Sequence, residues 1–328
     1  MPVGMWPVRS RAVQTALVCC LIGSFVAALL LLVGCNGSAP ATDSAGDRAL
    51  RIVATIGQIA DAVRRVGGDA VEVHALMGPG VDPHLYRASE SDITRLESAD
   101  AVFWNGLHLE AGMTGVLERM EDLGVRSVRV TDGIDRGQLL APPEFEGAYD
   151  PHVWFDLGLW AVVVASIRDA LVDLDPAGAA TYRANAEAYV AEIEDLDAYV
   201  TEQADTLDAA IRALVTAHDA FNYFARRYGF EVRGLQGIST ESEASTADVQ
   251  ALARFISDRG IRAVFIESSV PDQGVQAVIE AAGARGHTVV VGGEIYSDAM
   301  GAAGTPEGTY LGMIRHNIDT IVSGLSGE

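Results

Sequence analysis

The segment that most constrains the fold is the longest uninterrupted periodic stretch, Ala179–Asp205. It contains no Gly or Pro, and its apolar residues recur at alternating spacings of four and three: Tyr182, Ala186, Tyr189, Ile193, Leu196 and Val200. This spacing places them on one face of an α-helix, which would extend roughly 40 Å at about 1.5 Å per residue. A helix of that length predicts a stiff link between two halves of the protein rather than a part of either half.

Short apolar runs alternate with amphipathic segments on both sides of this helix. The strands predicted before it are 50–55, 71–77, 101–104 and 127–130, and those after it are 212–216, 231–235, 263–266 and 288–291. The helices predicted between and beyond them are 58–66, 89–98, 111–123, 157–174, 220–228, 247–259, 273–284 and 310–325. Such alternation is typical of parallel sheets covered by helices. We therefore expect an α/β fold with two lobes, residues 50–176 and 207–328, each with a mostly parallel sheet, joined by a linking helix at 177–206.

The N-terminus carries the features of an export signal. Residues 1–34 contain Arg9 and Arg11, no acidic residue, and an apolar run that ends in Leu-Val-Gly before Cys35. This pattern predicts a lipoprotein signal peptide, with Cys35 becoming the lipidated first residue. An uncleaved membrane span is the alternative, because the run is long enough to cross a bilayer. Residues 35–49 are small and polar, which predicts a flexible tether, and either reading places the rest of the chain outside the cytoplasm.

Charge and cysteine content narrow the possible partners. The formal net charge is −22, and it becomes −24 once the two arginines of the signal are removed. A strongly acidic body argues against nucleic acid and anionic membrane surfaces as partners. Cys19 and Cys20 lie inside the predicted signal, so a chain that begins at Cys35 has no free thiol for a metal or a disulfide. We expect a monomer.

Two Asp-Pro-His tripeptides, Asp82-Pro83-His84 and Asp150-Pro151-His152, are the main candidate site residues. Any single His in such a turn is more often a capping or loop residue, but the repeat favours a shared role, and imidazole is the commonest protein ligand for transition metals. Each His follows a predicted strand of the first half, as His218 and Asp298 do in the second half. Ligands of parallel α/β lobes bind at the carboxyl ends of strands. Three imidazoles and one carboxylate are therefore expected to meet in a cleft between the lobes.

These motifs resemble those of the metal-specific solute-binding lipoproteins of bacterial ABC importers, the manganese/zinc group of solute-binding protein family 9. The resemblance covers essentially the whole chain after Leu50. It rests on both Asp-Pro-His segments, Asn105-Gly106-Leu107 with Glu110, 217–221, 237–244, 265–267 and 295–301. It implies the ligand set His84, His152, His218 and Asp298. It also implies a non-enzymatic, lipid-anchored receptor on the outer face of the membrane or in the periplasm, which captures a divalent ion and delivers it to a permease driven by a separate ATPase subunit.

The resemblance does not decide whether the ion is Mn²⁺ or Zn²⁺. Zinc-dedicated members often carry a His-rich acidic loop between the first two ligands, whereas 85–151 contains only His108. Its absence favours manganese as the physiological ion, although three nitrogens and a carboxylate suit tetrahedral Zn²⁺ and the Irving–Williams order predicts tighter zinc binding in vitro. Glu243, Glu267 and His108 are candidates for orienting a metal ligand by a hydrogen bond, without binding the metal themselves. His74, His287 and His316 are expected to be surface or capping residues.

Two other classes of function compete with this interpretation. A zinc hydrolase also uses His and carboxylate ligands, but it keeps an open coordination position and a general base, and the sequence has no His-Glu-x-x-His or Gly-x-Ser-x-Gly element. A receptor for a metal chelate such as a siderophore would share the long linking helix. It would bind through Arg and aromatic side chains, without convergent imidazoles.

Overall fold

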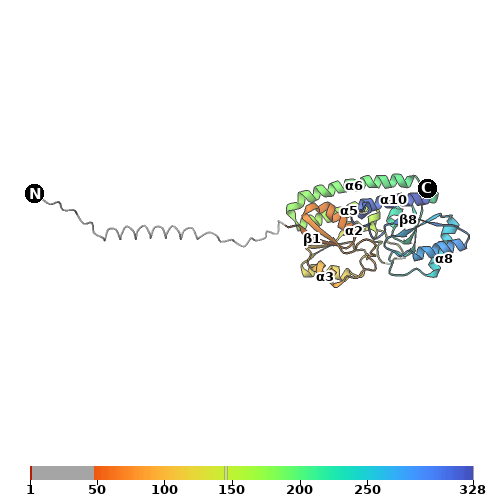
Figure 1. The fold of residues 1–328 in the computed structure, drawn as a ribbon, viewed down its shortest axis with the longest axis horizontal. Helices are drawn as coiled ribbons and strands as arrows, with labels where there is room; N and C mark the ends of the chain where they lie inside the picture. The colour runs from red at the N-terminus through yellow and green to blue at the C-terminus, as the bar shows by residue number, and fades with distance from the viewer. Residues whose placement is uncertain (2–47, 144, 146, 328) are drawn as a thin grey trace. The chain divides into compact units, whose positions relative to one another are not determined.

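The computed structural model describes Met1 and residues 48–143, 145 and 147–327 (Figure 1). Contacts divide the chain into two units, Met1–Asp47 and Arg48–Glu328, and the fold below is that of the second. Apart from Met1, the predicted signal peptide (1–34) lies outside the described residues, as do Cys35 and most of the tether (35–49). Among the described residues, none of the helices combines the length and apolar character that a membrane crossing requires.

The first lobe contains a four-stranded, wholly parallel sheet. Its strands are β1 (Leu50–Ala54), β2 (Val71–Ala75), β3 (Ala101–Trp104) and β4 (Arg126–Arg129), in the order β2-β1-β3-β4. Helices α2 (Gly57–Gly67), α3 (Glu90–Glu97) and α4 (Thr114–Arg119) follow β1, β2 and β3 along the chain. Ser89 begins α3 with a capping box, because its hydroxyl accepts from Asp92 N and the Asp92 carboxylate accepts from Ser89 N. Because the strands are parallel, the loops after β2 and β4 both begin at the carboxyl-end side of the sheet.

The second lobe contains two parallel strand pairs, β5 (Ala213–His218) with β6 (Glu231–Gln236), and β7 (Ala263–Glu267) with β8 (Val290–Ile295). Strands β5 and β7 lie side by side, so the two pairs are adjacent. Helices α7 (Asn222–Tyr228), α8 (Thr246–Arg259), α9 (Gln273–Ala284) and α10 (Tyr310–Ser326) complete the lobe. A separate apolar cluster beneath α8 and α9 includes Leu252, Ile256 and Val278.

Helix α6 (Ala179–Asp205) links the lobes and passes along both of them, over α5 (Leu157–Leu174) and α10 (Figure 1). Its six predicted face residues are all buried, so the periodicity correctly predicted both the helix and its packed side. Asn185 Nδ2 donates to Val66 O of α2, and Tyr199 OH donates to Asp319 of α10. One continuous apolar core contains residues of both lobes and of α6, which is why the helix holds them as a unit.

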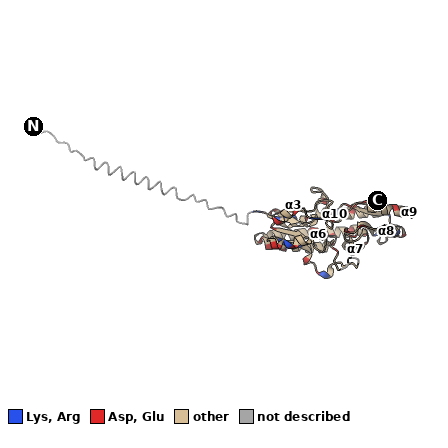
Figure 2. Ribbon diagram, turned by 90° about the horizontal axis from the view of Figure 1, so that it is seen from below, with Lys and Arg blue, Asp and Glu red and all other residues tan. Residues whose placement is uncertain are grey.

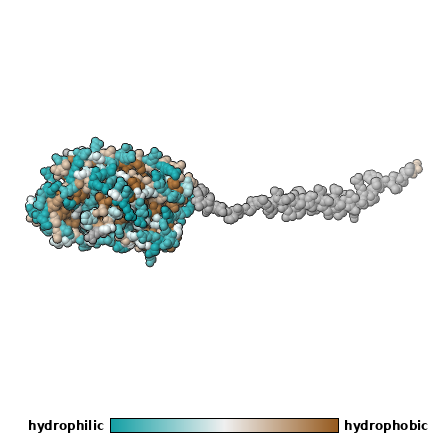
Figure 3. All heavy atoms as spheres, turned by 180° about the vertical axis from the view of Figure 1, so that it is seen from behind, coloured by the Kyte–Doolittle hydropathy of each residue, from teal (hydrophilic) through white to brown (hydrophobic). Residues whose placement is uncertain are grey.

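An ion-pair cluster reinforces the joint between α5, α6 and α7. The Arg227 guanidinium donates to Asp156 Oδ1 at 2.8 Å and to both oxygens of Asp197 at 2.6 Å. Asp156 also caps α5 by accepting from Gly158 N and Leu159 N. Away from this joint, basic residues are few and scattered in Figure 2, and hydrophobic residues form separate small areas on the face drawn in Figure 3.

Three sequence predictions of secondary structure were wrong in extent. The helix predicted at 111–123 is only α4 followed by a 3₁₀ turn at Glu121–Leu123, and residues 106–108 before it form a left-handed turn, with φ of 82°, 55° and 69°. The strand predicted at 288–291 is β8, which runs on through Gly292 and Gly293. A Cβ at Gly293 would lie 2.4 Å from Thr320 of α10, so the glycines allow close packing instead of ending the strand. Strand β5 extends to His218, which was predicted to lie in a loop.

Candidate metal centre

Each of the four predicted ligands lies at or beyond the carboxyl end of a strand. His84 is in the loop after β2, and His152 is in the long loop between β4 and α5. His218 is the last residue of β5, and Asp298 lies three residues after β8. All four side chains are buried, with no more than 1% of their surface exposed. The fold therefore brings two residues of each lobe to one point, as the sequence predicted.

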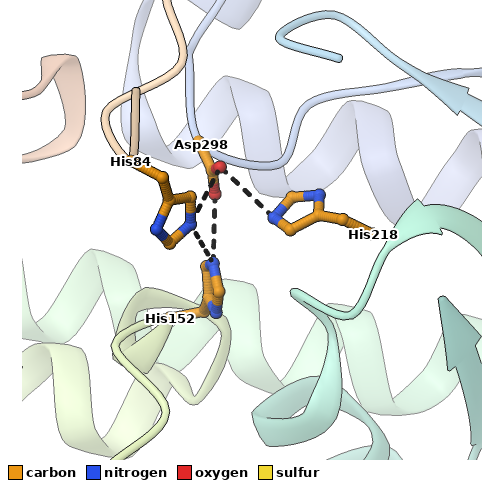
Figure 4. A group of neighbouring side chains, drawn as sticks. All are labelled: His84, His152, His218 and Asp298. Atoms are coloured by element: carbon orange, nitrogen blue, oxygen red, sulfur yellow. Dashed lines mark hydrogen bonds and ion pairs between the residues drawn. The ribbon is translucent and has the colours of Figure 1, made fainter. Parts of the chain in front are cut away.

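The atoms that face one another are the three Nε2 nitrogens and the Asp298 carboxylate (Figure 4). His218 Nε2 lies 3.2 Å from Asp298 Oδ2, and His152 Nε2 lies 3.3 Å from Oδ1. His84 Nε2 lies 3.6 Å from Oδ2 and 3.4 Å from His152 Nε2. One ligand atom from each residue can be chosen so that all lie within 4.8 Å of one another.

These separations fit a single four-coordinate ion. At metal–nitrogen distances of about 2.0–2.1 Å, the corners of a tetrahedron lie about 3.3–3.4 Å apart. Within the described part of the chain, His218 Nε2 and both Asp298 oxygens are buried without a hydrogen-bond partner, although buried polar atoms of native proteins nearly always have one. A cation at the centre would satisfy all three. With four protein ligands, the coordination shell has no open position for an activated water, which is the arrangement of a binding site rather than a hydrolytic one.

The repeated tripeptide has a local structural meaning. Asp82 Oδ1 accepts from the backbone N of His84 at 2.8 Å, and Asp150 Oδ1 accepts from the backbone N of His152 at 3.0 Å. The intervening Pro has no N–H and fixes its own φ. Each tripeptide is therefore a tight Asx-type turn that presents its imidazole from a fixed backbone.

Two buried carboxylates orient the rings of His152 and His218. Asp150 Oδ1 lies 2.7 Å from His152 Nδ1, and Glu267 Oε2 lies 2.6 Å from His218 Nδ1. Glu267 Oε1 also accepts from the backbone N of His218 at 2.9 Å. A proton held on Nδ1 leaves the lone pair of Nε2 directed at the centre, as is usual for metal-ligating His. Glu267 was among the predicted candidates for this role, whereas Asp150 was missed as an orienting group even though the Asp-Pro-His repeat had drawn attention to it.

The electrostatics separate His84 from the other two imidazoles. Burial lowers the pKa of His84 to about 3. Burial also acts to lower the pKa of His152, but the carboxylates of Asp150 and Asp298 outweigh it and raise that pKa to about 9. For His218 the burial effect is likewise outweighed, by Glu267 and Asp298, and its pKa lies well above the usual value. Although burial favours the neutral acid, His218 and His152 hold the pKa of Asp298 well below its usual range. An incoming cation would therefore displace protons from the site.

The other candidate residues do not reach the site. Glu243 is exposed in the loop before α8, and His108 is exposed in the left-handed turn; neither contacts a proposed ligand among the described residues. These two predictions of orienting roles were wrong, because proximity in sequence to a conspicuous motif does not fix where a loop side chain points. His287 and His316 bond backbone carbonyls of Ile261 and Glu294, and His74 lies in β2.

Two further side chains of the first lobe hold the loop that carries Asp298. Gln58 of α2 is buried and its Nε2 donates to the backbone O of Asp298 at 3.2 Å, and Trp154 Nε1 donates to the backbone O of Ser297 at 3.1 Å. Both bonds join the first lobe to the Asp298 loop. A cavity of about 140 Å³ reaches Asp298 between the loops after β2 and β8, with Met77 and Met300 among its lining residues.

Comparison with known proteins agrees with the fold. The family model "Zinc-uptake complex component A periplasmic" matches residues 52–324. The zinc-binding protein TroA of Treponema pallidum is 49% identical over 302 residues, covering 92% of this chain and 97% of the relative. The manganese-binding lipoprotein MntA of Bacillus subtilis is 45% identical, covering 93% and 98%. The iron-binding protein YfeA of Yersinia pestis is 34% identical, covering 84% and 86%.

A solved structure of the periplasmic zinc-binding protein TroA from Treponema pallidum superposes with a TM-score of 0.82 at 50% identity, covering 84% of this chain and 99% of that one. This likeness confirms the predicted arrangement of two α/β lobes joined by a long helix. Together, the family match over most of the chain and the extent of these identities show that the chain belongs to the family of periplasmic zinc-uptake component A proteins, the metal-binding solute receptors of ABC importers.

Proposed function

We propose that this protein binds one divalent transition-metal ion through His84, His152, His218 and Asp298 and delivers it to the permease of an ABC importer. The observation that carries the proposal is the convergence of three buried Nε2 atoms on a buried carboxylate that has no other side-chain partner among the residues the structure describes. The family contributes the transport context, in which a permease and its ATPase subunit are the partners. A hydrolytic role is not favoured, because four protein ligands fill the coordination shell and the relatives are metal-binding proteins.

The ion itself is proposed to be Mn²⁺ or Zn²⁺, the metals named for two similar relatives. A His₃-carboxylate set is suited to zinc by geometry and by the Irving–Williams order, so zinc should bind more tightly in vitro whichever ion is imported. We further propose the boundaries 50–176, 177–206 and 207–328 for the lobes and linking helix, a monomeric state, and a lipid anchor on Cys35 that holds the protein to the outer face of the cell membrane.

Melting curves test the metal proposal. The full-length chain in detergent is stripped with a chelator, and its melting temperature is measured with Mn²⁺, Zn²⁺ and Fe²⁺, beside His218→Ala. An ion that binds only the folded state at 100 times its Kd should stabilise it by about 2.7 kcal/mol. We expect a shift for at least one ion that is lost in the variant. No shift with any of the three ions would refute the proposal, and the chelate-receptor alternative would then be tested with ferric siderophores.

A further inference from the structure

The aspartates of the two Asp-Pro-His tripeptides share a second contact, made with the other lobe. In each, one carboxylate oxygen accepts from the backbone N of its own His. The second oxygen accepts from a donor of the second lobe: Thr240 Oγ1 bonds Asp82 Oδ2 at 2.6 Å, and Asn222 Nδ2 bonds Asp150 Oδ2 at 3.1 Å. Each aspartate therefore connects a ligand's backbone to the opposite lobe. Because the same arrangement occurs at two separate loops, we infer that both aspartates have the same structural role.

His84 depends on this connection more than His152 does. The ring of His152 is also held directly by Asp150 at Nδ1, and Tyr223 OH donates to the backbone O of Asp150 at 3.0 Å. Among the described residues, Nδ1 of His84 has no carboxylate partner. The orientation of His84 therefore rests on its backbone turn, and that turn is fixed by Asp82.

Thr240 lies in the loop between β6 and α8 and is 6% exposed, so its bond to the half-buried Asp82 is shielded from water. A hydroxyl donating to a carboxylate at this distance is a charge-assisted bond, which is stronger than a neutral one. The neighbouring cross-lobe pair, Arg87 with Glu241, is exposed on both sides and its charged atoms lie 3.8 Å apart, so it contributes little. Thr240 is thus the principal hydrogen-bonding link between the second lobe and the turn that carries His84.

We propose that Thr240 is a positioning residue for metal binding. It fixes Asp82, which in turn fixes the backbone of His84 and places Nε2 at the metal centre. The bond crosses the cleft, so any separation of the lobes must break it, and His84 is then the ligand that loses its support. This inference rests on the proposed function, since it assumes that His84 is a ligand.

The test compares Thr240→Val, which removes the hydroxyl while nearly preserving shape, with Thr240→Ser, which keeps it. The full-length chain in detergent is stripped, and its Kd and dissociation rate for Zn²⁺ and Mn²⁺ are measured by competition with a fluorescent chelator. Loss of a group that orients a metal ligand through hydrogen bonds, without binding the metal itself, costs about 10–100-fold in metal affinity. We expect that loss in Thr240→Val, mostly as faster dissociation, and a Kd within about twofold of wild type in Thr240→Ser.

The visible absorption spectrum of the Co²⁺-loaded protein separates positioning from packing, because it reports the coordination geometry. It should change in Thr240→Val and stay like that of wild type in Thr240→Ser and in Ser242→Ala, a control in the same exposed loop. A wild-type Kd and spectrum in Thr240→Val would overturn the inference, as would equal loss in Val and Ser variants. If Thr240→Val does not fold, Thr240→Ala takes its place. Failure of the wild type to bind any ion would instead refute the proposed function and this inference with it.

Discussion

Replacing Glu267 by Gln should weaken metal binding through a change of tautomer in His218. The Glu267 carboxylate accepts two bonds from His218, one from its backbone N at 2.9 Å and one at Nδ1 at 2.6 Å. A Gln side chain has only one acceptor oxygen. The backbone N–H is always a donor and claims that oxygen, so the amide NH₂ faces Nδ1. Nδ1 must then accept, which moves the ring proton to Nε2, the atom that faces the metal.

The magnitude follows from this forced exchange. Before the metal ion can bind to Nε2, the proton must return to Nδ1, where it makes an unfavourable donor–donor contact with the Gln amide. Otherwise the ion must bind without His218 as a ligand. Loss of an orienting carboxylate of this kind costs about 10–100-fold in affinity, which corresponds to about 1.4–2.8 kcal/mol. The metal-free protein should also lose about 1.5–3 kcal/mol of unfolding free energy, because a buried bond to a charged group is replaced.

Competition with a fluorescent zinc chelator measures the affinity, and urea unfolding of the stripped protein measures the stability. Glu243→Gln is the matched control: it makes the same chemical change at an exposed position of the same lobe and should leave both quantities unchanged. A Kd for Glu267→Gln within twofold of wild type would refute the argument that the tautomer of His218 matters.

Three further predictions concern pH, the lobe joint and the left-handed turn. Burial acts to lower the pKa of His152, but Asp150 and Asp298 outweigh it and raise that pKa to about 9, above the ordinary value of about 6.5. The protonated ring therefore stabilises the metal-free fold fully below pH 6.5, and this stabilisation is lost as the pH rises toward 9. A metal ion that binds to His152 must displace the same proton. The increase in melting temperature caused by Zn²⁺ should therefore grow from pH 6 to pH 8 in scanning fluorimetry, and an increase that does not change with pH would contradict this. Arg227→Gln should lower the unfolding free energy by about 1–3 kcal/mol in urea, because it removes bonds to Asp156 and Asp197 that are only partly exposed, and no loss of stability would show that the cluster is dispensable. His108→Ala should leave the Kd for Zn²⁺ unchanged, since His108 is exposed, and a loss above threefold would mean that the turn reaches the site.

The parts of the fold that sequence predicts well are those with a strong local signal. The long helix, predicted at 177–206 and observed at Ala179–Asp205, was predicted closely, because its period is regular and no Gly or Pro breaks it. The strand at Ala101–Trp104 and the helix at Gln273–Ala284 were predicted with the same accuracy. Errors arose at 111–123, where only a short helix forms, and at 288–291, where close packing against α10 gives the glycines a role that local propensity does not reveal.

For the site, the residue types and their positions after strands were enough to select His84, His152, His218 and Asp298, and the resemblance strengthened the choice. The residues that hydrogen-bond to the proposed ligands were harder to predict. Asp150 lies two residues from its partner and has a local signal, but Glu267 meets His218 only because β5 and β7 lie side by side. Gln58 and Thr240 act across lobes, over separations of 240 and 158 residues, and no local pattern could have linked them to Asp298 and Asp82.

Element-specific anomalous diffraction from crystals of the metal-loaded protein, recorded at the zinc and manganese absorption edges, would locate the bound ion and identify its ligands. We expect one peak, enclosed by the Nε2 atoms of His84, His152 and His218 and by the Asp298 carboxylate, at about 2.0–2.2 Å from each ligand atom. The absence of a peak there, or a peak held by other residues, would contradict this expectation.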